Sequence, residues 1–330
     1  MTDTVRTDFT ILAANDGAAL GAVVRQACGV AWGAAKKLIS TGKVSLDGAT
    51  VTDPGTRVRA GQKVRIDPVA PRVGPGHETL LSRDAIVHID QHIVVVNKPS
   101  GVSTVPYEEG ERGTLVDRLR VTLHRAGKAD ANAPLFVVHR IDKETSGLVV
   151  FARSWLAKRH LSTLFREHAI ERRYLALVNG VFDRARATFD THLVENRGDG
   201  LRGSAKQSGL GVRAVTHVEI LAHGEQAEVT LLRCQLETGR THQIRIHLAE
   251  AGYPLVGEHV YSRHYEGPSF EAPRMMLHAA VLGFSHPAQL DRAMRFSVSV
   301  PDDFDATAMR AGIDVRTLEE EIEGDAKKRT

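Results

Sequence analysis

The sequence predicts an α+β protein with two domains, a small one at the N-terminus and a larger one built on a mixed, largely antiparallel sheet. Strand-like runs dominate the chain and few helical patterns lie between them, which is typical of such a sheet and not of a βαβ repeat. A length of 330 residues is enough for two cores. A stretch rich in proline and glycine also interrupts the chain early.

This stretch sets the expected domain boundaries. Residues 68–76 hold three of the twelve prolines and two glycines, with little hydrophobic periodicity around them. Proline lacks an amide donor and glycine has no conformational preference, so the composition indicates a linker. We therefore expect a small α+β domain at 1–68, a linker at 69–84, the main domain at 85–310 and an acidic tail at 311–330.

Two helices and a hairpin are expected in the N-terminal domain. The helical patterns are "GAALGAVVRQACG" and "AWGAAKKLISTG", and Gly42 stands where a left-handed helix cap is expected. "KVSLDGATV" alternates around Asp47-Gly48, a pair typical of a type I′ hairpin turn.

Positive charge is densest in this domain. Residues 1–70 hold nine Lys and Arg against six Asp and Glu, although the whole chain has a net charge of only +3. Four basic residues cluster around the helices: Arg25, Lys36, Lys37 and Lys43. They form either a face for RNA or a solvated helix face, and charge alone favours the solvated face.

The main domain is predicted to alternate strands with isolated helices. Residues 85–101 indicate two strands around a polar turn, and the apolar spacing of 154–168 indicates a helix between two strands. Thr241 and Gly252 are expected to cap and close a short helix in "THQIRIHLAEAG". The remaining strand-like runs are "SGLVVFAR", "RRYLALV", "AVTHVEIL", "QAEVTLLRCQLET" and "MMLHAAVLGFS".

The composition excludes several classes of protein. With 42% hydrophobic and 25% charged residues, the chain has the balance of a soluble globular protein. Cys28 and Cys234 form no CxxC pair, which argues for a reducing compartment and against a disulfide scaffold or a Cys-rich zinc site. No apolar run approaches membrane-spanning length, and the N-terminus lacks the layout of a signal peptide. We expect a cytoplasmic protein with no membrane contact.

Asp142 stands between bases in "VVHRIDKETSGLVVFAR", residues 137–153. His139 and Arg140 precede it and Lys143 follows it. The carboxylate has two interpretations: a turn residue that closes onto backbone amides, or a catalytic group held ionised by a nearby guanidinium. Periodicity alone favours the turn.

Two hydrolase chemistries are weak alternatives for this segment. Ser146 and His139 lie near Asp142 in sequence, but no G-x-S-x-G is present, and the members of a catalytic triad normally come from separate elements. Glycosidase-like chemistry needs a second carboxylate, for which Glu144 is the nearest candidate.

A metal site is not predicted. His242 and His247 flank Arg245, whose charge opposes a bound cation, and their spacing does not place them on one helix face. Both histidines are expected to hydrogen-bond or to lie in the core.

Ordered sequence blocks span residues 85 to 305 of the main domain. They are "NKPSGVSTVP", "HRIDKETSGLVVFAR", "RRYLALV", "LETGRTHQIRIHLAEAGYPLVGEHVY", "RMMLHAAVLGFSHP" and "SVSVPDDF". Together these blocks resemble the large ribosomal-type family of RNA pseudouridine synthases. Through "AAKKLISTGKVSLDG" and "AGQKVRI", the segment 17–67 resembles the S-four RNA-binding domain.

This resemblance implies a reaction and a set of site residues. The glycosidic bond of a uridine in RNA breaks, and the base rejoins the ribose through carbon 5, with neither cofactor nor metal. Asp142 matches the catalytic aspartate, as nucleophile or as base toward the sugar, and Arg245 matches the arginine that keeps it charged. Tyr174 matches the tyrosine that stacks on the base and is suspected of removing the carbon 5 proton, although a core aromatic fits its strand equally well. Arg140 matches the arginine that enters the RNA stack when the uridine flips out.

Departures from the family pattern are small. Ile141 replaces a more usual leucine, Glu171 stands where lysine is common, and "GEHVYS" differs from a more usual Gly-Asp and Tyr-Gly. The Gly-rich basic segment 195–213 is either an RNA-contacting loop or a surface insertion.

We expect a monomer whose partner is RNA, with large-subunit ribosomal RNA as the first candidate and transfer RNA as the second. The rival interpretation is an RNA-binding or ribosome-assembly protein without catalysis. The intact set of Asp142, Tyr174 and Arg245 favours the enzyme, because a binding protein has no chemical use for it.

Overall fold

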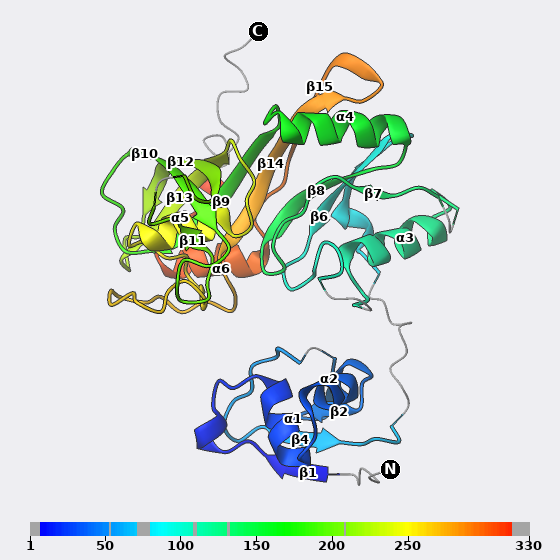
Figure 1. Ribbon diagram of the computed structural model, residues 1–330, viewed down its shortest axis with the longest axis vertical. Coiled ribbons are helices and arrows are strands. Elements are labelled where there is room, and N and C mark those ends of the chain that lie inside the picture. Colours follow the sequence, from blue (N-terminus) through cyan, green and yellow to red (C-terminus); the bar gives the residue numbers. More distant parts are fainter. Residues whose placement is uncertain are drawn as a thin grey trace. The chain divides into compact units, whose positions relative to one another are not determined.

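The computed structural model describes residues 7–52, 54–70, 80–107, 111–130, 133–207 and 209–318. It divides into two compact units, Met1–Thr79 and Leu80–Thr330. Figure 1 colours the first unit blue and the second from cyan to red. Most of the predicted linker, residues 71–79, lies outside the described residues.

The N-terminal unit is a small antiparallel sheet packed against two helices. Its strands lie in the order β1-β4-β2-β3. The apolar faces of both helices meet the sheet in one core, in which Leu20, Ile39 and Ile66 are fully buried. The elements are β1 Thr7–Thr10, α1 Leu20–Cys28, α2 Trp32–Ser40, β2 Val44–Leu46, β3 Ala49–Val51 and β4 Lys63–Ile66, with a 3-10 turn at Ala13–Asn15.

Both turn predictions for this unit are confirmed. Gly42 has a φ of 73° and donates to the carbonyl of Ile39, while Lys43 donates to Leu38, which is the hydrogen-bond pattern of a left-handed helix end. Asp47 and Gly48 have φ values of 50° and 84°, as a type I′ turn between β2 and β3 requires.

The larger unit is built on one long, mixed sheet, which confirms the predicted fold class. Its strand order is β11-β10-β12-β13-β9-β14-β8-β6-β5, with β15 beside β14 and β7 beside β8. Among the described strands of this unit, β8 and β14 pair in parallel and the other pairs are antiparallel. The strands are β5 Ile86–Ile89, β6 Ile93–Lys98, β7 Phe136–Val137, β8 Ser146–Ala152, β9 Glu171–Asn179, β10 Arg186–Val194, β11 Gly203–Ser204, β12 Val212–His223, β13 Val229–Leu236, β14 Leu277–His286 and β15 Gln289–Ser297.

Helices cover both faces of this sheet. On one face, α3 and α5 pack with alternate residues of the central strands; on the other face, α4 and α6 pack with the residues between them. Strands β6 and β8 are therefore buried on both sides and consist of nearly continuous apolar residues. The helices are α3 Leu115–Arg125, α4 Trp155–Arg166, α5 Gln243–Glu250 and α6 Asp302–Arg310, with 3-10 turns at Arg83–Ala85 and Arg316–Leu318 (Figure 1).

Two segments that were expected to lie outside the core are partly packed. In the predicted linker, Leu81 is 5% exposed and its amide donates to the hydroxyl of Thr122. In the predicted acidic tail, Ile313 and Val315 are each 2% exposed and join the core beside α6. Apolar side chains at these positions extend the fold beyond the boundaries that composition indicates. Residues from 319 onward lie outside the described part of the chain.

Candidate active site

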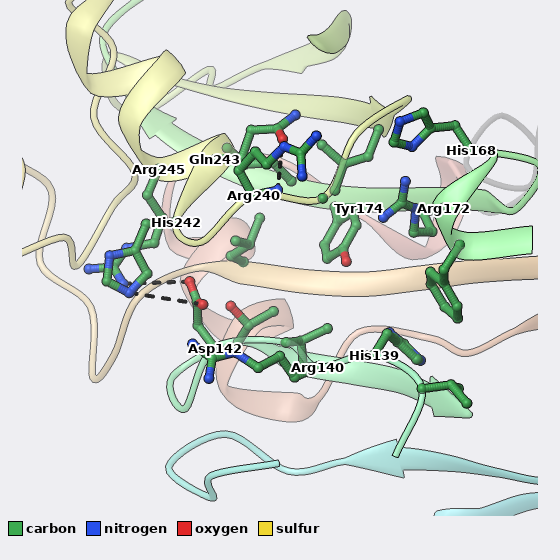
Figure 2. Close-up of a pocket in the computed structure, with 18 of the residues that line it drawn as sticks. His139, Arg140, Asp142, His168, Arg172, Tyr174, Arg240, His242, Gln243 and Arg245 are labelled. Atoms are coloured by element: carbon green, nitrogen blue, oxygen red, sulfur yellow. Dashed lines mark hydrogen bonds and ion pairs between the residues drawn. The ribbon is translucent and has the colours of Figure 1, made fainter. Parts of the chain in front are cut away.

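All three candidate catalytic residues, Asp142, Tyr174 and Arg245, line one pocket of about 520 Å³ in the larger unit. Five segments form it: the loop between β7 and β8, the end of α4 with the turn after it, the start of β9, the end of β13 through the first turn of α5, and the first residue of β14 (Figure 2). The lining residues that bear on the chemistry are His139, Arg140, Asp142, His168, Arg172, Tyr174, Arg240, His242, Gln243 and Arg245.

The loop that carries Asp142 is anchored by the end of β6 and the segment that follows it. Lys98, fully buried, donates from Nζ to three carbonyls, including that of Lys143 at 3.0 Å. Thr104 donates to the carbonyl of Ile141 at 2.9 Å. These bonds bracket Asp142 on both sides, so its backbone has little freedom. Burial lowers the pKa of Lys98 to about 7, and its three carbonyl acceptors favour the charged form.

Asp142 also closes its own turn, because its carbonyl accepts from the amide of Thr145 at 3.1 Å. The backbone therefore takes the turn role, and the carboxylate is left to face the pocket with 21% of the side chain exposed. The backbone thus meets the turn interpretation, and the catalytic role of the carboxylate stays a prediction.

Arg245 lies 3.5 Å from this carboxylate, measured from Nη1 to Oδ2. It projects from α5 and is 8% exposed. Its other nitrogens are occupied, because Nε and Nη2 donate to the two carboxylate oxygens of Glu258 at 2.7 and 2.9 Å. Glu258 thus orients the guanidinium so that Nη1 faces Asp142.

Glu258 is a site residue that the sequence did not single out. Its side chain is 1% exposed and also accepts from the amide of Val260 at 2.8 Å. Burial opposes its charge, but the bonds from Arg245 outweigh burial and lower its pKa. Burial likewise opposes the charge of Arg245, whose pKa is nevertheless raised by its bonds to Glu258. The segment "GEHVYS" contained the signal, since this glutamate stands where the resemblance expects aspartate.

His242 completes the surroundings of Asp142. Its Nε2 lies 4.0 Å from Oδ1 of Asp142, and its Nδ1 is 2.7 Å from the hydroxyl of Tyr261. Dashed lines in Figure 2 join Asp142 to His242 and Arg245. Burial lowers the pKa of His242.

The prediction that Thr241 caps α5 is wrong. His242 occupies the cap position, with a φ of 58° and no side-chain cap bond. This left-handed backbone is uncommon for a residue with a side chain, and it occurs here where the ring meets the pocket. A capping threonine cannot be combined with that turn one residue later.

Tyr174 on β9 lines the same pocket and is 9% exposed. It also belongs to the core cluster beneath the pocket, so its two predicted roles, core aromatic and pocket wall, are compatible. Burial raises the pKa of its hydroxyl to about 12. The phenol is therefore protonated at neutral pH.

His139 and Arg140 point in opposite senses from one segment. The ring of His139 stacks on Phe165 at a centroid distance of 4.5 Å, and its Nε2 accepts from the amide of Val150. Burial lowers the pKa of His139 to about 3, so the ring is neutral. Arg140 is exposed and lines the pocket. The histidine holds the segment while the arginine stays available to a ligand.

The four basic residues predicted to bind RNA lie in the N-terminal unit. Arg25 and Lys37 are exposed on α1 and α2, while Lys36 and Lys43 are half-buried. Lys43 donates to the carbonyl of Ala70. They belong to the other compact unit and line no part of the Asp142 pocket.

His247 is a bonded histidine of the core. It is 2% exposed, with Nδ1 at 2.9 Å from the hydroxyl of Thr216 and Nε2 at 3.0 Å from that of Thr191. Within the described ranges, no group of three His, Cys, Asp or Glu side chains is arranged to hold a metal ion. No helix in the same ranges is long and apolar enough to cross a bilayer.

Comparison with known proteins supports what this geometry suggests. Residues 92–250 match the RNA pseudouridylate synthase family, and residues 33–64 match the S4 domain. The chain is 36% identical over 277 residues to a ribosomal large subunit pseudouridine synthase D of Zymomonas mobilis, covering 81% of this chain and 85% of that protein. The chain belongs to the RNA pseudouridylate synthase family.

Other members of the family agree. An uncharacterized RNA pseudouridine synthase of Bacillus subtilis, YlyB, is 33% identical, with 80% of this chain and 84% of that protein covered. The solved structure of human RNA pseudouridylate synthase domain containing 4 superposes with a TM-score of 0.56 at 25% identity, covering 69% of this chain and 93% of that one. This chain is therefore an RNA pseudouridine synthase, an isomerase, with an N-terminal S4 domain.

Replacing Glu258 by Gln should destabilise this pseudouridine synthase by about 3–5 kcal/mol, because it removes the buried counter-charge that binds Arg245 through two hydrogen bonds and leaves only the more exposed Asp142. The pKa of Glu258 is lowered in the folded chain, so its contribution exists above the ordinary carboxyl pKa and is lost as the pH falls through the lowered value. The difference between variant and wild type should therefore close on acidification. Denaturant unfolding across pH measures both effects.

The matched control is Asp190→Asn, which breaks an exposed two-bond pair with Arg213. Water screens that pair, so its loss should leave the unfolding midpoint unchanged. Equal midpoints for the Glu258 variant and the wild type at neutral pH would contradict the assigned role of Glu258.

Proposed function

We propose that this enzyme isomerises specific uridines of large-subunit ribosomal RNA, with Asp142 as its catalytic carboxylate. The observation that carries the proposal is the Asp142–Arg245–Glu258 arrangement, in which a buried pair aims one guanidinium nitrogen at a pocket-facing carboxylate. Support for the RNA class comes from relatives that are named ribosomal large subunit pseudouridine synthase D, in Zymomonas mobilis, Neisseria meningitidis and Pseudomonas aeruginosa.

The proposed chemistry begins at the ribose. Asp142 either attacks carbon 1′ or removes a proton from carbon 2′, and in both routes the base leaves with the electrons of the glycosidic bond. Arg245 keeps the carboxylate ionised when RNA excludes water from the pocket. The isomerisation conserves all atoms and electrons, so it needs neither an oxidant nor a group donor, and we propose that it uses no cofactor.

Tyr174 is proposed to contact the target base, and Arg140 is proposed to contact the RNA around it. The tyrosine ring forms a wall on which the flipped uracil stacks, and its hydroxyl is the candidate acceptor of the carbon 5 proton. Because the pKa of that hydroxyl is raised to about 12, it is protonated beforehand and needs a partner to take up this role. Exposed Arg140 enters the gap that the flipped uridine leaves, where unstacking costs a few kcal/mol.

The N-terminal unit is proposed to hold structured RNA through Arg25, Lys36, Lys37 and Lys43. The match to the S4 domain supports RNA as the partner, and it covers three of these four residues. We further propose that the protein acts as a monomer. A cytoplasmic location fits a ribosomal RNA substrate.

Asp142→Asn should abolish turnover while RNA binding survives, because the amide keeps the shape but loses the charge and the nucleophilic oxygen. Tritium release from ribosomal RNA labelled at carbon 5 of uridine measures turnover, and filter binding measures affinity. Release by this variant at the wild-type rate would overturn Asp142 as the catalytic carboxylate, whereas no release by the wild type would leave the chain with RNA binding as its function. Tritium release from transfer RNA alone would make transfer RNA the substrate in place of ribosomal RNA, and it would leave the proposed reaction unchanged.

Arg140→Ala and Arg245→Ala should fail in different ways. Loss of Arg140 should slow reaction mainly on duplexed targets, and a short unstructured RNA should be partly spared, because its uridine is already unstacked. Loss of Arg245 removes the counter-charge of Asp142, so every RNA should suffer equally, with partial recovery at higher pH.

Turnover of both variants on structured and unstructured RNA across pH tests this pair of roles. An equal loss of turnover rate on both RNAs for Arg140→Ala would contradict the proposal that Arg140 enters the gap left by the flipped uridine. A folded Arg245→Ala without recovery at high pH speaks against the counter-charge.

Deleting residues 1–79 should leave the larger unit folded and active on a short RNA, because each unit has its own core. Affinity for ribosomal RNA should fall and its dependence on salt should become shallower, as phosphate contacts are lost. Titration at several salt concentrations measures both. Identical binding curves for the full chain and the deletion would remove the N-terminal unit from RNA recognition.

A further inference from the structure

A second buried arginine lines the pocket, and the proposed mechanism leaves it unused. Arg172 on β9 is 7% exposed. Its Nη2 donates to the backbone carbonyl of Glu237 at 2.7 Å, while its Nε is buried without a hydrogen-bond partner. No carboxylate of the described residues forms an ion pair with it, unlike Arg245, which has two. A buried positive charge is therefore left without a counter-charge at the pocket wall.

The residues around Arg172 leave space for its guanidinium group. Its guanidinium lies 5.7 Å from the ring centre of Phe165, within the range of a cation–π contact. Gly239 faces it on the other side, where a Cβ would come within 2.5 Å of Nη1. Burial lowers the pKa of Arg172, which measures how strongly the site disfavours an unpaired charge. An anion that enters the pocket would relieve this cost.

The position of Arg172 in the pocket indicates which anion it meets. Arg140, Arg166 and Arg240 are exposed at the pocket and can meet phosphates of the RNA backbone. Arg172 is buried two residues before Tyr174, on the same face of β9. In the view of Figure 2, Tyr174 lies between Asp142 and Arg172. With the ribose at Asp142 and the base on Tyr174, the far edge of the base meets Arg172.

We propose that Arg172 stabilises the negative charge of the departing uracil at its O4 edge. When the bond between carbon 1′ and N1 breaks, its electron pair leaves with N1 and spreads over O2, C5 and O4. Asp142 meanwhile forms a bond to carbon 1′ or takes the carbon 2′ proton. Carbon 5 then joins carbon 1′ as the bond from carbon 1′ to Asp142 breaks, or as Asp142 returns its proton to carbon 2′. Carbon 5 finally loses its proton to a base, and N1 takes up a proton. The charge exists only during this exchange, so the stabilisation acts on the rate and not on the binding of uridine.

The same contact selects uracil. Cytosine carries an amino group in place of O4, which would point N–H bonds at a guanidinium that can only donate. This inference rests on the proposed chemistry at Asp142, but it does not depend on which RNA is the substrate.

The test compares Arg172→Gln with wild type on two RNAs that differ only at the target nucleotide, uridine or 5-fluorouridine. The RNA is any that the wild-type enzyme converts, so an error in the ribosomal assignment changes the choice of RNA and not the role inferred for Arg172. Fluorine withdraws electrons and stabilises the uracil anion by itself. Single-turnover loss of the N1-linked nucleotide, measured by mass spectrometry of digested RNA, reports the cleavage rate.

Arg172→Gln should slow cleavage of the uridine target by about 10²- to 10³-fold, the usual effect of losing one preorganised donor. The factor by which Arg172→Gln slows cleavage should be about tenfold smaller on the 5-fluorouridine target than on the uridine target. RNA affinity should change little. Arg172→Lys, which keeps the charge but not the planar donors, should fall between glutamine and wild type, and it serves the same comparison if the glutamine variant does not fold.

Arg173→Gln is the matched control, because Arg173 is the next residue on β9 and pairs with Glu171 away from the pocket lining. It should leave both cleavage rates unchanged. Equal losses of Arg172→Gln on the two RNAs would show a structural role and overturn the proposal. Weakened binding with an unchanged cleavage rate would show a backbone phosphate contact, which would also overturn it.

Discussion

The buried pair of Arg245 and Glu258 is the interaction on which the rest of the site depends. A guanidinium has donors on three nitrogens, and Glu258 takes up two of them, so only Nη1 is free to face Asp142. A buried pair of this kind adds little to stability by itself, but breaking it is costly. In this site the pair orients the guanidinium of Arg245, because it holds that charge at a defined position beside the Asp142 carboxylate, which must stay ionised.

Asp142 is held in place by side-chain bonds from another strand. Lys98, the last residue of β6, and Thr104 in the segment after it donate to carbonyls on either side of Asp142. β6 and β8 are paired neighbours, and Lys98 at the end of β6 pairs with Gly147 at the start of β8, so this anchoring segment and the catalytic loop leave the sheet side by side. These two buried strands thereby position one side of the pocket, while α5 and the loop after it position the other.

The arginines that line the pocket fall into an exposed group and a buried group. Exposed arginines such as Arg140 and Arg240 remain solvated and can meet phosphates, because water stabilises their charge. Arg245 and Arg172 are buried, where an unpaired charge is costly and an electrostatic contact is correspondingly strong. Arg245 is paired from the start, whereas Arg172 has no ion-pair partner among the described residues. Similar residues therefore serve different purposes, which composition alone cannot distinguish.

The sequence alone determined the fold class, the turns of the N-terminal unit and the pocket residues Asp142, Tyr174 and Arg245. Turn chemistry and strand alternation are local, since Asp47-Gly48 or a buried strand imposes its geometry on its neighbours. The ordered family blocks carried the catalytic assignment, because periodicity favoured a simple turn for Asp142. The family comparison confirms the enzyme class, and the individual roles of these residues stay predictions.

Only the tertiary structure decided the partners of these residues. Glu258 lies 13 positions from Arg245 in the sequence, and Arg172 gains its environment from Phe165 and Gly239 on other segments. It also decided the start of α5, where the left-handed backbone of His242 replaced the cap expected at Thr241. Burial and ion pairing depend on which distant segments the fold brings together. No local pattern encodes them, so the sequence could name the reactive groups but not the charges that control them.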